Sequence, residues 1–391
     1  MARPSGSEAH AMPATTRQGH VVVAPDKFKG TLEAAEAAAR IAAGIRRAAP
    51  GVEVRELPVA DGGEGTLAAA LAAGFARVPV KVAGPTGVPV DAALAVRGDT
   101  AVVELAQAAG LARLPGGRTA PLTAGSYGVG ELIGRALDHG ARRIVLGLGG
   151  SASTDGGAGL LQALGVSLLD GDGVELPPGG AALRRLARID SGPSARILEG
   201  VEVVVACDVD NPLLGPRGAA AVYGPQKGAS GADLVVLEEG LTRFADVVGA
   251  TVGRDVRDAP GAGAAGGVGF AALALLGAAM RPGIELLLDL LGFDAEVRGA
   301  ALVVTGEGCL DAQTLHGKAP AGVAAAAVRA GVPVAAVAGR VELSEREWRA
   351  AGFVAAYALG ELGASPAEGL TRAGELAEVA GERLAADLLN R

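Results

Sequence analysis

The sequence predicts an α/β protein of two domains, in which a parallel-sheet domain is interrupted by an inserted mixed α/β domain. From residue 20 to residue 75, apolar strand-like runs alternate with helical patterns, which predicts a parallel sheet with right-handed crossovers. From residue 76, three strand-like runs follow one another without a helix between them, which predicts antiparallel pairing. The alternating pattern resumes at residue 300. We therefore expect a discontinuous domain of residues 20–75 and 291–391, an inserted domain of residues 76–290, and a disordered leader of residues 1–19.

Each part of the discontinuous domain begins with an expected buried strand. Residues 20–24, H-V-V-V-A, form a short β-branched run, and the helix after them is expected to have Thr31 as its N-cap and to stop at Pro50. A second strand at 52–57 and an alanine-rich helix after Thr66 complete the first part. For the second part we expect a strand at 300–305, a glycine loop at 306–308, a helix from about Lys318, and strands at 332–338 and 353–358.

The inserted domain is expected to open with a meander. Its three strands are separated by turn signals at residues 84–85 and 98–99, which favour antiparallel neighbours. The expected strands are residues 78–82, 90–96, 101–105, 144–146 and 201–206, and a long helix is expected at 232–248.

Composition and charge argue against several classes of protein. The 391-residue chain has a net charge of −8 and no basic cluster longer than a pair, and nucleic-acid binding depends on neutralising phosphates. Aromatic residues make up 3% of the chain, too few for base stacking. The longest apolar segment, residues 270–280, is too short to span a bilayer. Cys207 and Cys309 lie far apart without metal-ligand spacing, so no disulfide framework is expected and a reducing cytoplasm fits.

The segment at residues 144–159, I-V-L-G-L-G-G-S-A-S-T-D-G-G-A-G, is the strongest candidate for ligand binding. It predicts a strand, a bare loop and a helix. Glycines allow backbone N–H groups to approach a ligand, and a helix start favours an anion, above all phosphate. We expect phosphate to be bound by Gly147, Gly149, Gly150 and Ser151. A tight turn in a glycine-rich protein is the alternative.

Asp155 is the single carboxylate of this segment. Standing among glycines and hydroxyl residues, it could orient or deprotonate a substrate hydroxyl. A plain N-cap is the alternative. We expect Asp155 to act as a catalytic residue.

Charged residues in two other loops suit phosphate and metal chemistry. Lys27 and Lys29 follow the first strand without nearby carboxylate partners, so they are candidates to bind phosphate oxygens, although solvated loop lysines would look the same. We expect both to act as catalytic residues that neutralise charge on the transferring group. Asp208 and Asp210 follow the strand at 201–206. Paired carboxylates suit Mg²⁺ held together with substrate phosphates, and a simple turn is the alternative.

A literal G-x-G-x-x-G occurs at residues 261–266. The dinucleotide fingerprint requires a strand just before it, and the preceding residues 254–260 are not strand-like. Gly263 and Gly266 are therefore expected to contact phosphate rather than to mark a nicotinamide site. A Walker A motif is absent, because Ala312 stands where its first glycine would precede Gly317-Lys318.

These loops together predict an enzyme that binds a polyphosphate and a small polar substrate between two domains. Loops at the carboxyl ends of parallel strands gather at one edge, where ligands bind. Phosphoryl transfer is the leading interpretation. A dinucleotide-dependent oxidoreductase and a non-catalytic sugar-acid sensor are the rivals, and the sensor's expected helix-turn-helix with basic flanks is not seen.

As a set, these loops resemble the bacterial type-1 glycerate kinase family. The resemblance covers nearly the whole chain after residue 19. The motifs are V-V-V-A-P-D-K-F-K-G-T-L at 21–32, L-P-V-A-D-G-G-E-G-T at 57–66, L-G-L-G-G-S-A-S-T-D-G-G-A-G at 146–159, V-A-C-D-V-D-N-P-L at 205–213, A-V-Y-G-P-Q-K-G-A at 221–229, P-G-A-G-A-A-G-G at 260–267 and T-G-E-G-C-L-D-A-Q-T at 305–314. Two positions depart from the usual pattern: Thr154 stands where Asn is common, and Cys309-Leu310 where Arg-Ile is usual.

The resemblance implies ATP-dependent phosphorylation of D-glycerate, usually to 2-phosphoglycerate, with another small hydroxy acid as the alternative substrate. It also implies a discontinuous flavodoxin-like domain and an inserted domain resembling a restriction-endonuclease fold, with the active cleft between them. We expect Mg²⁺ near Asp208 and Asp210 to bridge the ATP phosphates. Substrate contacts are expected from Asp61, Ser153 and Lys318. The sequence leaves a homodimer open.

Overall fold

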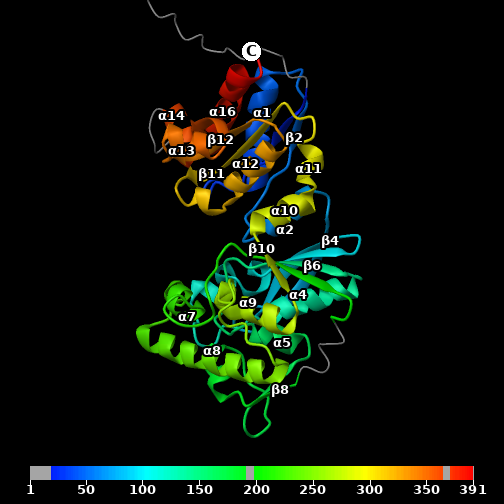
Figure 1. The fold of residues 1–391 in the computed structure, drawn as a ribbon, viewed down its shortest axis with the longest axis vertical. Helices are drawn as coiled ribbons and strands as arrows, with labels where there is room; N and C mark the ends of the chain where they lie inside the picture. The colour runs from blue at the N-terminus through cyan, green and yellow to red at the C-terminus, as the bar shows by residue number, and fades with distance from the viewer. Residues whose placement is uncertain (1–18, 191–197, 364–369, 391) are drawn as a thin grey trace, which may run out of the picture.

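The computed structural model describes residues 19–190, 198–363 and 370–390. The expected leader therefore lies outside the described residues, apart from Gly19. The described chain forms two lobes stacked along the long axis of the molecule (Figure 1), each built around its own main sheet. The division into domains with the expected boundaries stays a prediction.

The sheet of the first lobe has five strands in the order β13-β12-β11-β1-β2. Every neighbouring pair is parallel. Read from the other edge, this is the order 2-1-3-4-5 of a flavodoxin-like sheet, so the predicted fold class of this lobe is confirmed. The strands are β1 (Val21–Val23), β2 (Val54–Glu56), β11 (Leu302–Leu310), β12 (Val334–Val341) and β13 (Phe353–Ala358).

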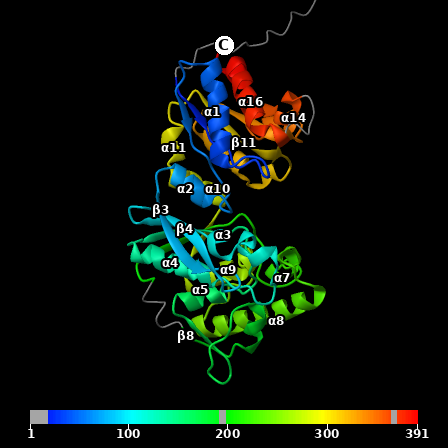
Figure 2. The ribbon, with the colours of Figure 1, turned by 180° about the vertical axis from the view of Figure 1, so that it is seen from behind.

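Helices cover both faces of this sheet because successive strand residues point to opposite sides. Val21 and Val23 pack with α1 (Ala34–Ala48) and α16 (Ala373–Leu388). Val22 packs on the other face, against α10 (Gly283–Leu291) and α12 (Ala319–Arg329). Figure 2 shows α1 beside α16 from behind. The lobe is completed by α11 (Phe293–Glu296), η5 (Thr314–His316), α13 (Glu345–Ala350) and α14 (Leu359–Leu362).

The sheet of the second lobe is mixed, with six strands in the order β10-β9-β6-β5-β4-β3. The first three strands along the chain form the expected antiparallel meander, whereas the later pairs are parallel. The strands are β3 (Ala76–Ala83), β4 (Pro89–Arg97), β5 (Thr100–Glu104), β6 (Arg143–Gly147), β9 (Glu202–Ala206) and β10 (Ala279–Arg281). A separate pair joins β7 (Ser167–Leu169) to β8 (Arg188–Asp190).

The large core of the second lobe lies on one face of this sheet. Phe244 and Phe270 meet edge-to-face there, with ring centroids 5.7 Å apart. The long helix at its base begins with a complete capping box, in which the hydroxyl of Ser230 accepts from the backbone N–H of Asp233. The helices are α3 (Ala106–Ala109), η1 (Leu111–Arg113), η2 (Pro115–Gly117), α4 (Tyr127–Asp138), α5 (Ala158–Ala163), η3 (Gly180–Arg185), α7 (Ala219–Tyr223), η4 (Pro225–Lys227), α8 (Gly231–Val252) and α9 (Ala264–Leu275).

Two helices lie between the two sheets and belong to both cores. In α2 (Thr66–Ala72), Ala69 packs with the first lobe, whereas Leu67 packs against the second sheet. In α10, Leu287 faces the first lobe and Leu286 the second. The lobes are thus joined by a shared apolar layer.

Two expectations about local structure are wrong. Thr31 does not cap the first helix, which begins at Ala34 with Glu33 at the cap position. The Thr31 hydroxyl donates instead to the carbonyl of Phe28 (2.8 Å), because the buried Phe28 draws this segment into a tight turn.

The expected glycine loop at 306–308 is in fact part of a strand. The pairing of β11 with β12 continues to Cys309 and Leu310. Gly306 lies so close to β12 that a Cβ atom there would be 1.9 Å from the carbonyl oxygen of Val337. The missing side chain of Gly306 therefore allows close contact between the strands, whereas Gly308 lies against the backbone of Phe28 and Lys29. The continued strand carries Glu307 to the edge of the sheet.

In the described part of the chain, no helix combines the length and the apolar character needed to cross a membrane.

Candidate active site

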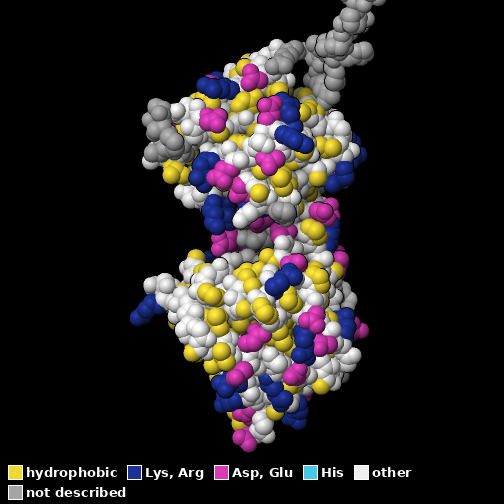
Figure 3. All heavy atoms as spheres, turned by 60° about the vertical axis from the view of Figure 1, so that its left-hand side comes forward, with side chains coloured by type: hydrophobic (Ala, Val, Ile, Leu, Met, Phe, Trp, Pro, Cys, Tyr) yellow, Lys and Arg dark blue, Asp and Glu magenta, His cyan; other side chains and the backbone are white. Residues whose placement is uncertain are grey.

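A cavity of about 1010 Å³ opens at the carboxyl ends of β1, β2 and β11. The strands β1 and β11 are neighbours, but the chain continues from β1 to β2 on one side and from β11 to β12 on the other. This divergence makes a topological switch point, where open α/β sheets bind ligands. Gly149 and Gly150 of the second lobe line the same cavity. Figure 3 shows the hollowed waist between the lobes, with acidic and basic side chains around it.

Acidic side chains from three loops and one strand line the cavity. Asp26 follows β1, Asp61 follows β2, Glu307 belongs to β11, and Asp311 follows it. Burial raises the pKa of Asp26 to about 7, and the nearby negative charge of Asp61 adds to this rise. Burial also raises the pKa of Glu307. The carboxyl groups of Asp26 and Glu307 therefore ionise less readily in this cavity than they would in water.

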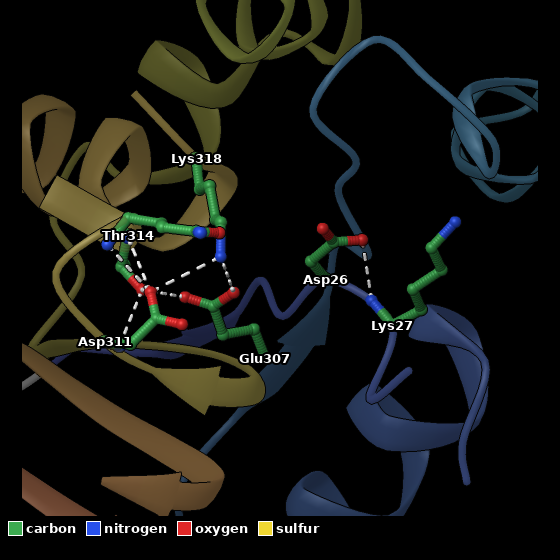
Figure 4. Close-up of polar contacts among 7 residues, drawn as sticks. Asp26, Lys27, Glu307, Asp311, Thr314 and Lys318 are labelled. Atoms are coloured by element: carbon green, nitrogen blue, oxygen red, sulfur yellow. Dashed lines mark hydrogen bonds and ion pairs between the residues drawn. The ribbon is translucent and has the colours of Figure 1, made fainter. Parts of the chain in front are cut away.

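Lys318 joins Glu307 and Asp311 into a small network (Figure 4). Its Nζ lies 3.8 Å from Glu307 Oε2 and 3.4 Å from Asp311 Oδ1. The Thr314 hydroxyl donates to Glu307 Oε1. Although burial alone would raise the pKa of Asp311, the N–H groups of Thr314 and Gln313 and the charge of Lys318 lower it overall. Lys318 thus lines the cavity with its positive charge shared between two carboxylates.

Lysines 27 and 29 line the same cavity as part of the loop after β1, and Figure 4 shows Lys27 beyond Asp26 from Lys318. Lys27 Nζ donates to the backbone carbonyl of Glu64 (2.8 Å) and lies 3.7 Å from Glu64 Oε2. The side chain of Lys29 is exposed and lines a neighbouring pocket together with Lys27. Arg340, at the end of β12, is a further cavity cation.

The loop after β6 touches the loop after β2 at its glycines. A Cβ atom on Gly149 would lie 2.5 Å from Gly63 Cα, and one on Gly150 would lie 2.3 Å from Glu64 Oε1. Gly147 lies behind them, buried, against the carbonyl of Gly62. Of the predicted phosphate-binding glycines, the structure brings Gly149 and Gly150 to the cavity wall. Their contact with phosphate stays a prediction.

Ser151, Ser153 and Asp155 are buried within the second lobe and do not line this cavity. Asp155 Oδ2 accepts from the backbone N–H and hydroxyl of Ser126 (both 2.8 Å) and from the N–H of Gly159 (3.1 Å). Its Oδ1 accepts from the N–H of Gly157 (3.2 Å). These bonds hold the start of α5, so the geometry supports the N-cap-like alternative. A catalytic role for Asp155 stays a prediction.

Lys227 is a buried ionisable residue that was not among the predicted site residues. Its side chain is 2% exposed, and its Nζ donates to the Ser151 hydroxyl (2.8 Å) and the Ser153 carbonyl (2.6 Å). Burial lowers the pKa of Lys227 to about 7, although the charge of Asp155 opposes this. Lys227 therefore anchors the glycine-rich segment at Ser151 and Ser153 from the interior of the second lobe.

The predicted metal ligands Asp208 and Asp210 have different surroundings. Asp208 Oδ1 accepts from the N–H of Gly283 (2.7 Å). Burial raises the pKa of Asp208 to about 6, helped by the charge of Asp61. Both residues are exposed, and Asp210 pairs with Arg217 at 3.0 Å. Across the described residues, no three His, Cys, Asp or Glu side chains are grouped so as to hold a metal ion.

Gly263 and Gly266 are packing positions in the described chain. A Cβ atom on Gly263 would lie 2.2 Å from the Pro212 carbonyl, and one on Gly266 would lie 2.1 Å from the Ser153 carbonyl. Neither lines the cavity. No strand precedes this segment, because residues 253–259 form turns and irregular chain. The dinucleotide fingerprint is therefore incomplete in structure as well as in sequence.

The family of the chain is decided by comparison with known proteins. A family model described as the glycerate kinase family matches residues 21–389. The chain belongs to the glycerate kinase family. This confirms the family predicted from the motifs and, with it, the prediction of an enzyme of the kinase class.

Individual members of the family are similar over most of their length. A protein named glycerate kinase from Bacillus subtilis is 50% identical over 325 residues, which are 82% of this chain and 85% of that protein. Glycerate 2-kinase from Escherichia coli is 46% identical over 82% of this chain and 84% of its own length. A crystal structure provisionally named glycerate kinase 2, from Salmonella typhimurium LT2, is 41% identical, covers 95% of this chain and 98% of its own, and superposes with a TM-score of 0.84.

Proposed function

We propose that the chain transfers the γ-phosphoryl group of ATP to the 2-hydroxyl of D-glycerate, which forms 2-phosphoglycerate and ADP. The family and the printed name of the Escherichia coli relative, glycerate 2-kinase, support this substrate and product. The observation that carries the proposal is a single cavity at the switch point of the first sheet, lined by lysines, carboxylates and a glycine-rich loop of the other lobe.

The basic side of the cavity suits the triphosphate. Phosphoryl transfer depends mainly on positioning and on neutralising charge. Lys27 and Lys29 supply positive charge from the loop after β1, and Arg340 supplies it from the end of β12. Gly149 and Gly150 present bare backbone at the same cavity. In this arrangement the phosphates lie along the lysine side, and the γ-phosphoryl group points towards the carboxylates.

The opposite side suits a short hydroxy acid. Lys318 is held at the cavity by Glu307 and Asp311, so it is positioned to bind the glycerate carboxylate. Asp61 faces the same space and can accept a hydrogen bond from a substrate hydroxyl. Ser153, the other predicted substrate contact, is fully buried in the second lobe and does not line the cavity.

Mg²⁺, when bound with ATP, would neutralise phosphate charge. Kinase sites commonly hold Mg²⁺ through one or two carboxylates plus the phosphates, so a preformed three-ligand cage is not required. Asp208 fits this role better than Asp210, because its Oδ2 has no hydrogen-bond partner among the described residues and it lies close enough to Asp61 for the charge of Asp61 to raise its pKa. Asp208 itself does not line the cavity. Asp210 fits poorly, since its carboxylate is occupied by Arg217.

An ADP-release assay across small hydroxy acids tests this function. We expect ADP with D-glycerate and ATP, and a phosphorus NMR spectrum of the product that matches 2-phosphoglycerate. A 3-phospho product would correct the position of transfer. ADP release with a different hydroxy acid but not with glycerate would refute the substrate, and NAD(P) reduction would refute the class.

A cytoplasmic location and a homodimer are also proposed. The two cysteines are both free in the described structure, which suits a reducing compartment. Cell fractionation tests the location. Analytical ultracentrifugation tests the dimer, which a single sedimenting species of monomer mass would exclude.

A further inference from the structure

Asp26 is the carboxylate that the fold fixes most directly at the switch point. Its backbone N–H donates to the Gly306 carbonyl of β11 (2.8 Å), and the preceding Pro25 carbonyl accepts from Val59 (3.0 Å). The residue is therefore held between the neighbours of β1 on both sides. Its Oδ1 accepts from the N–H of Lys27 (2.7 Å), which sets the orientation of the carboxyl group (Figure 4).

The other oxygen of Asp26 is free for a ligand. Within the described chain, Asp26 Oδ2 has no hydrogen-bond or ion-pair partner, although the side chain lines the cavity. Glu307 is engaged by Thr314 and Lys318, and Asp311 by two N–H groups and Lys318. Asp61 is alike in this respect, because its Oδ1 accepts from the N–H of Gly63 (3.2 Å) and its Oδ2 has no partner among the described residues. Asp26 differs from Asp61 in its place, since its own backbone pairs with β11 at the switch point.

Three charged groups face Asp26 from the surrounding elements. Asp61 from the β2 loop and Glu307 from β11 both oppose its ionisation, whereas the adjacent Lys27 favours it. Burial is the largest influence, and together these effects raise the pKa of Asp26 to about 7. A general base is most effective when its pKa lies near the working pH. The same carboxylate in water, with a pKa near 3.9, would be a weaker base.

We propose that Asp26 is the general base that accepts the proton of the glycerate hydroxyl during phosphoryl transfer. The proposal rests on the proposed function and names a catalytic residue within it. As the hydroxyl oxygen forms its bond to the γ-phosphorus, the bond from that phosphorus to the β-phosphate oxygen breaks and ADP leaves. The hydroxyl proton passes to Asp26 Oδ2. It is then released to solvent, which restores the carboxylate.

The test compares the pH dependence of four proteins: wild type, Asp26→Asn, Asp61→Asn and Asp155→Asn. Wild type is expected to lose kcat/KM below about pH 7, because Asp26 becomes protonated there. Asp26→Asn should lower kcat by about 10²- to 10⁴-fold, keep KM within about threefold, and abolish this acid limb. Asp61→Asn should keep the limb but move it to lower pH, because one charge opposing ionisation is gone.

The controls separate this role from folding and from the proposed function. Unchanged circular dichroism and ATP binding by calorimetry should accompany the loss in Asp26→Asn. Asp91→Asn, on the exposed part of β4, should retain wild-type kinetics.

Three results would overturn the proposal while leaving the function intact. They are a near wild-type kcat in Asp26→Asn, loss of the acid limb in Asp61→Asn, and loss of the acid limb in Asp155→Asn but not in Asp26→Asn. A wild-type protein that forms no phosphoglycerate from ATP and D-glycerate would instead refute the proposed function, and the role of Asp26 with it.

Discussion

Gly149→Ala tests whether the contact between the two glycine loops sets the geometry of the site. A methyl group at this position would lie 2.5 Å from Gly63 Cα and 3.1 Å from Glu64 N, whereas ordinary contact is 3.4–4 Å. The obstructing atoms belong to the backbone, so no rotamer change relieves them. The loops would have to separate by about 1 Å, and a misplacement of that size can cost about 10²-fold in rate. Overpacking itself costs about 1–3 kcal/mol of stability.

The matched control is Gly63→Ala, which approaches the same contact from the other side. Its methyl group would lie 3.3 Å from Asp61 Oδ1 and 3.6 Å from Gly149 Cα, so only a small adjustment is needed. We expect kcat/KM with ATP and D-glycerate to fall by about 100-fold in Gly149→Ala and by less than about tenfold in Gly63→Ala. Equal, near wild-type values for both variants, with unchanged urea midpoints, would refute the reasoning.

Three further predictions concern charged residues. Lys27→Met should lower kcat/KM by more than about tenfold, or about 1.4 kcal/mol, and an unchanged value would make Lys27 a solvated loop lysine. Asp208→Asn should weaken the Mg²⁺ dependence of the rate, whereas Asp210→Asn should not; equal Mg²⁺ titrations of the two variants would contradict this assignment. Lys227→Met should lower the free energy of unfolding by about 1–3 kcal/mol, because it leaves the Ser151 hydroxyl and the Ser153 carbonyl unpaired. Because the pKa of Lys227 falls from 10.5 to about 7 on folding, the unfolded state binds more protons between these values, and stability rises with pH. The advantage of wild type over Lys227→Met in urea unfolding should therefore grow from pH 7 to about pH 10, and a pH-independent difference would contradict the role of burial.

The class of fold was predictable because apolar periodicity and turn residues are local signals. The alternation at 20–75 predicted the parallel sheet, and the meander at 76–105 predicted the antiparallel strands. Local sequence signals did not predict the features that depend on tertiary contacts. Glycine weakens a strand, so β11 was expected to end before Gly306, yet Gly306 of β11 and Gly339 of β12 allow the two backbones to approach.

The candidate site was predictable where a charge follows a strand of the first sheet. Lys27, Lys29, Asp61 and Lys318 were expected at the site, and all four line the cavity. Asp155 shows the limit of this reasoning. A carboxylate among glycines looks the same in sequence whether it faces a ligand or N–H groups, and its main partner, Ser126, lies 29 residues away.

Two helices, α2 and α10, contribute apolar side chains to the cores of both lobes. Unfolding either lobe by itself would expose the helix surface that this lobe had buried. Exposing that surface costs a free energy of about 25 cal/mol for each Å² of apolar area. The two sheets should therefore lose their structure in one cooperative step. A calorimetric trace with a single peak, whose van't Hoff and calorimetric enthalpies agree, would show that a chain with two sheets behaves thermodynamically as one unit.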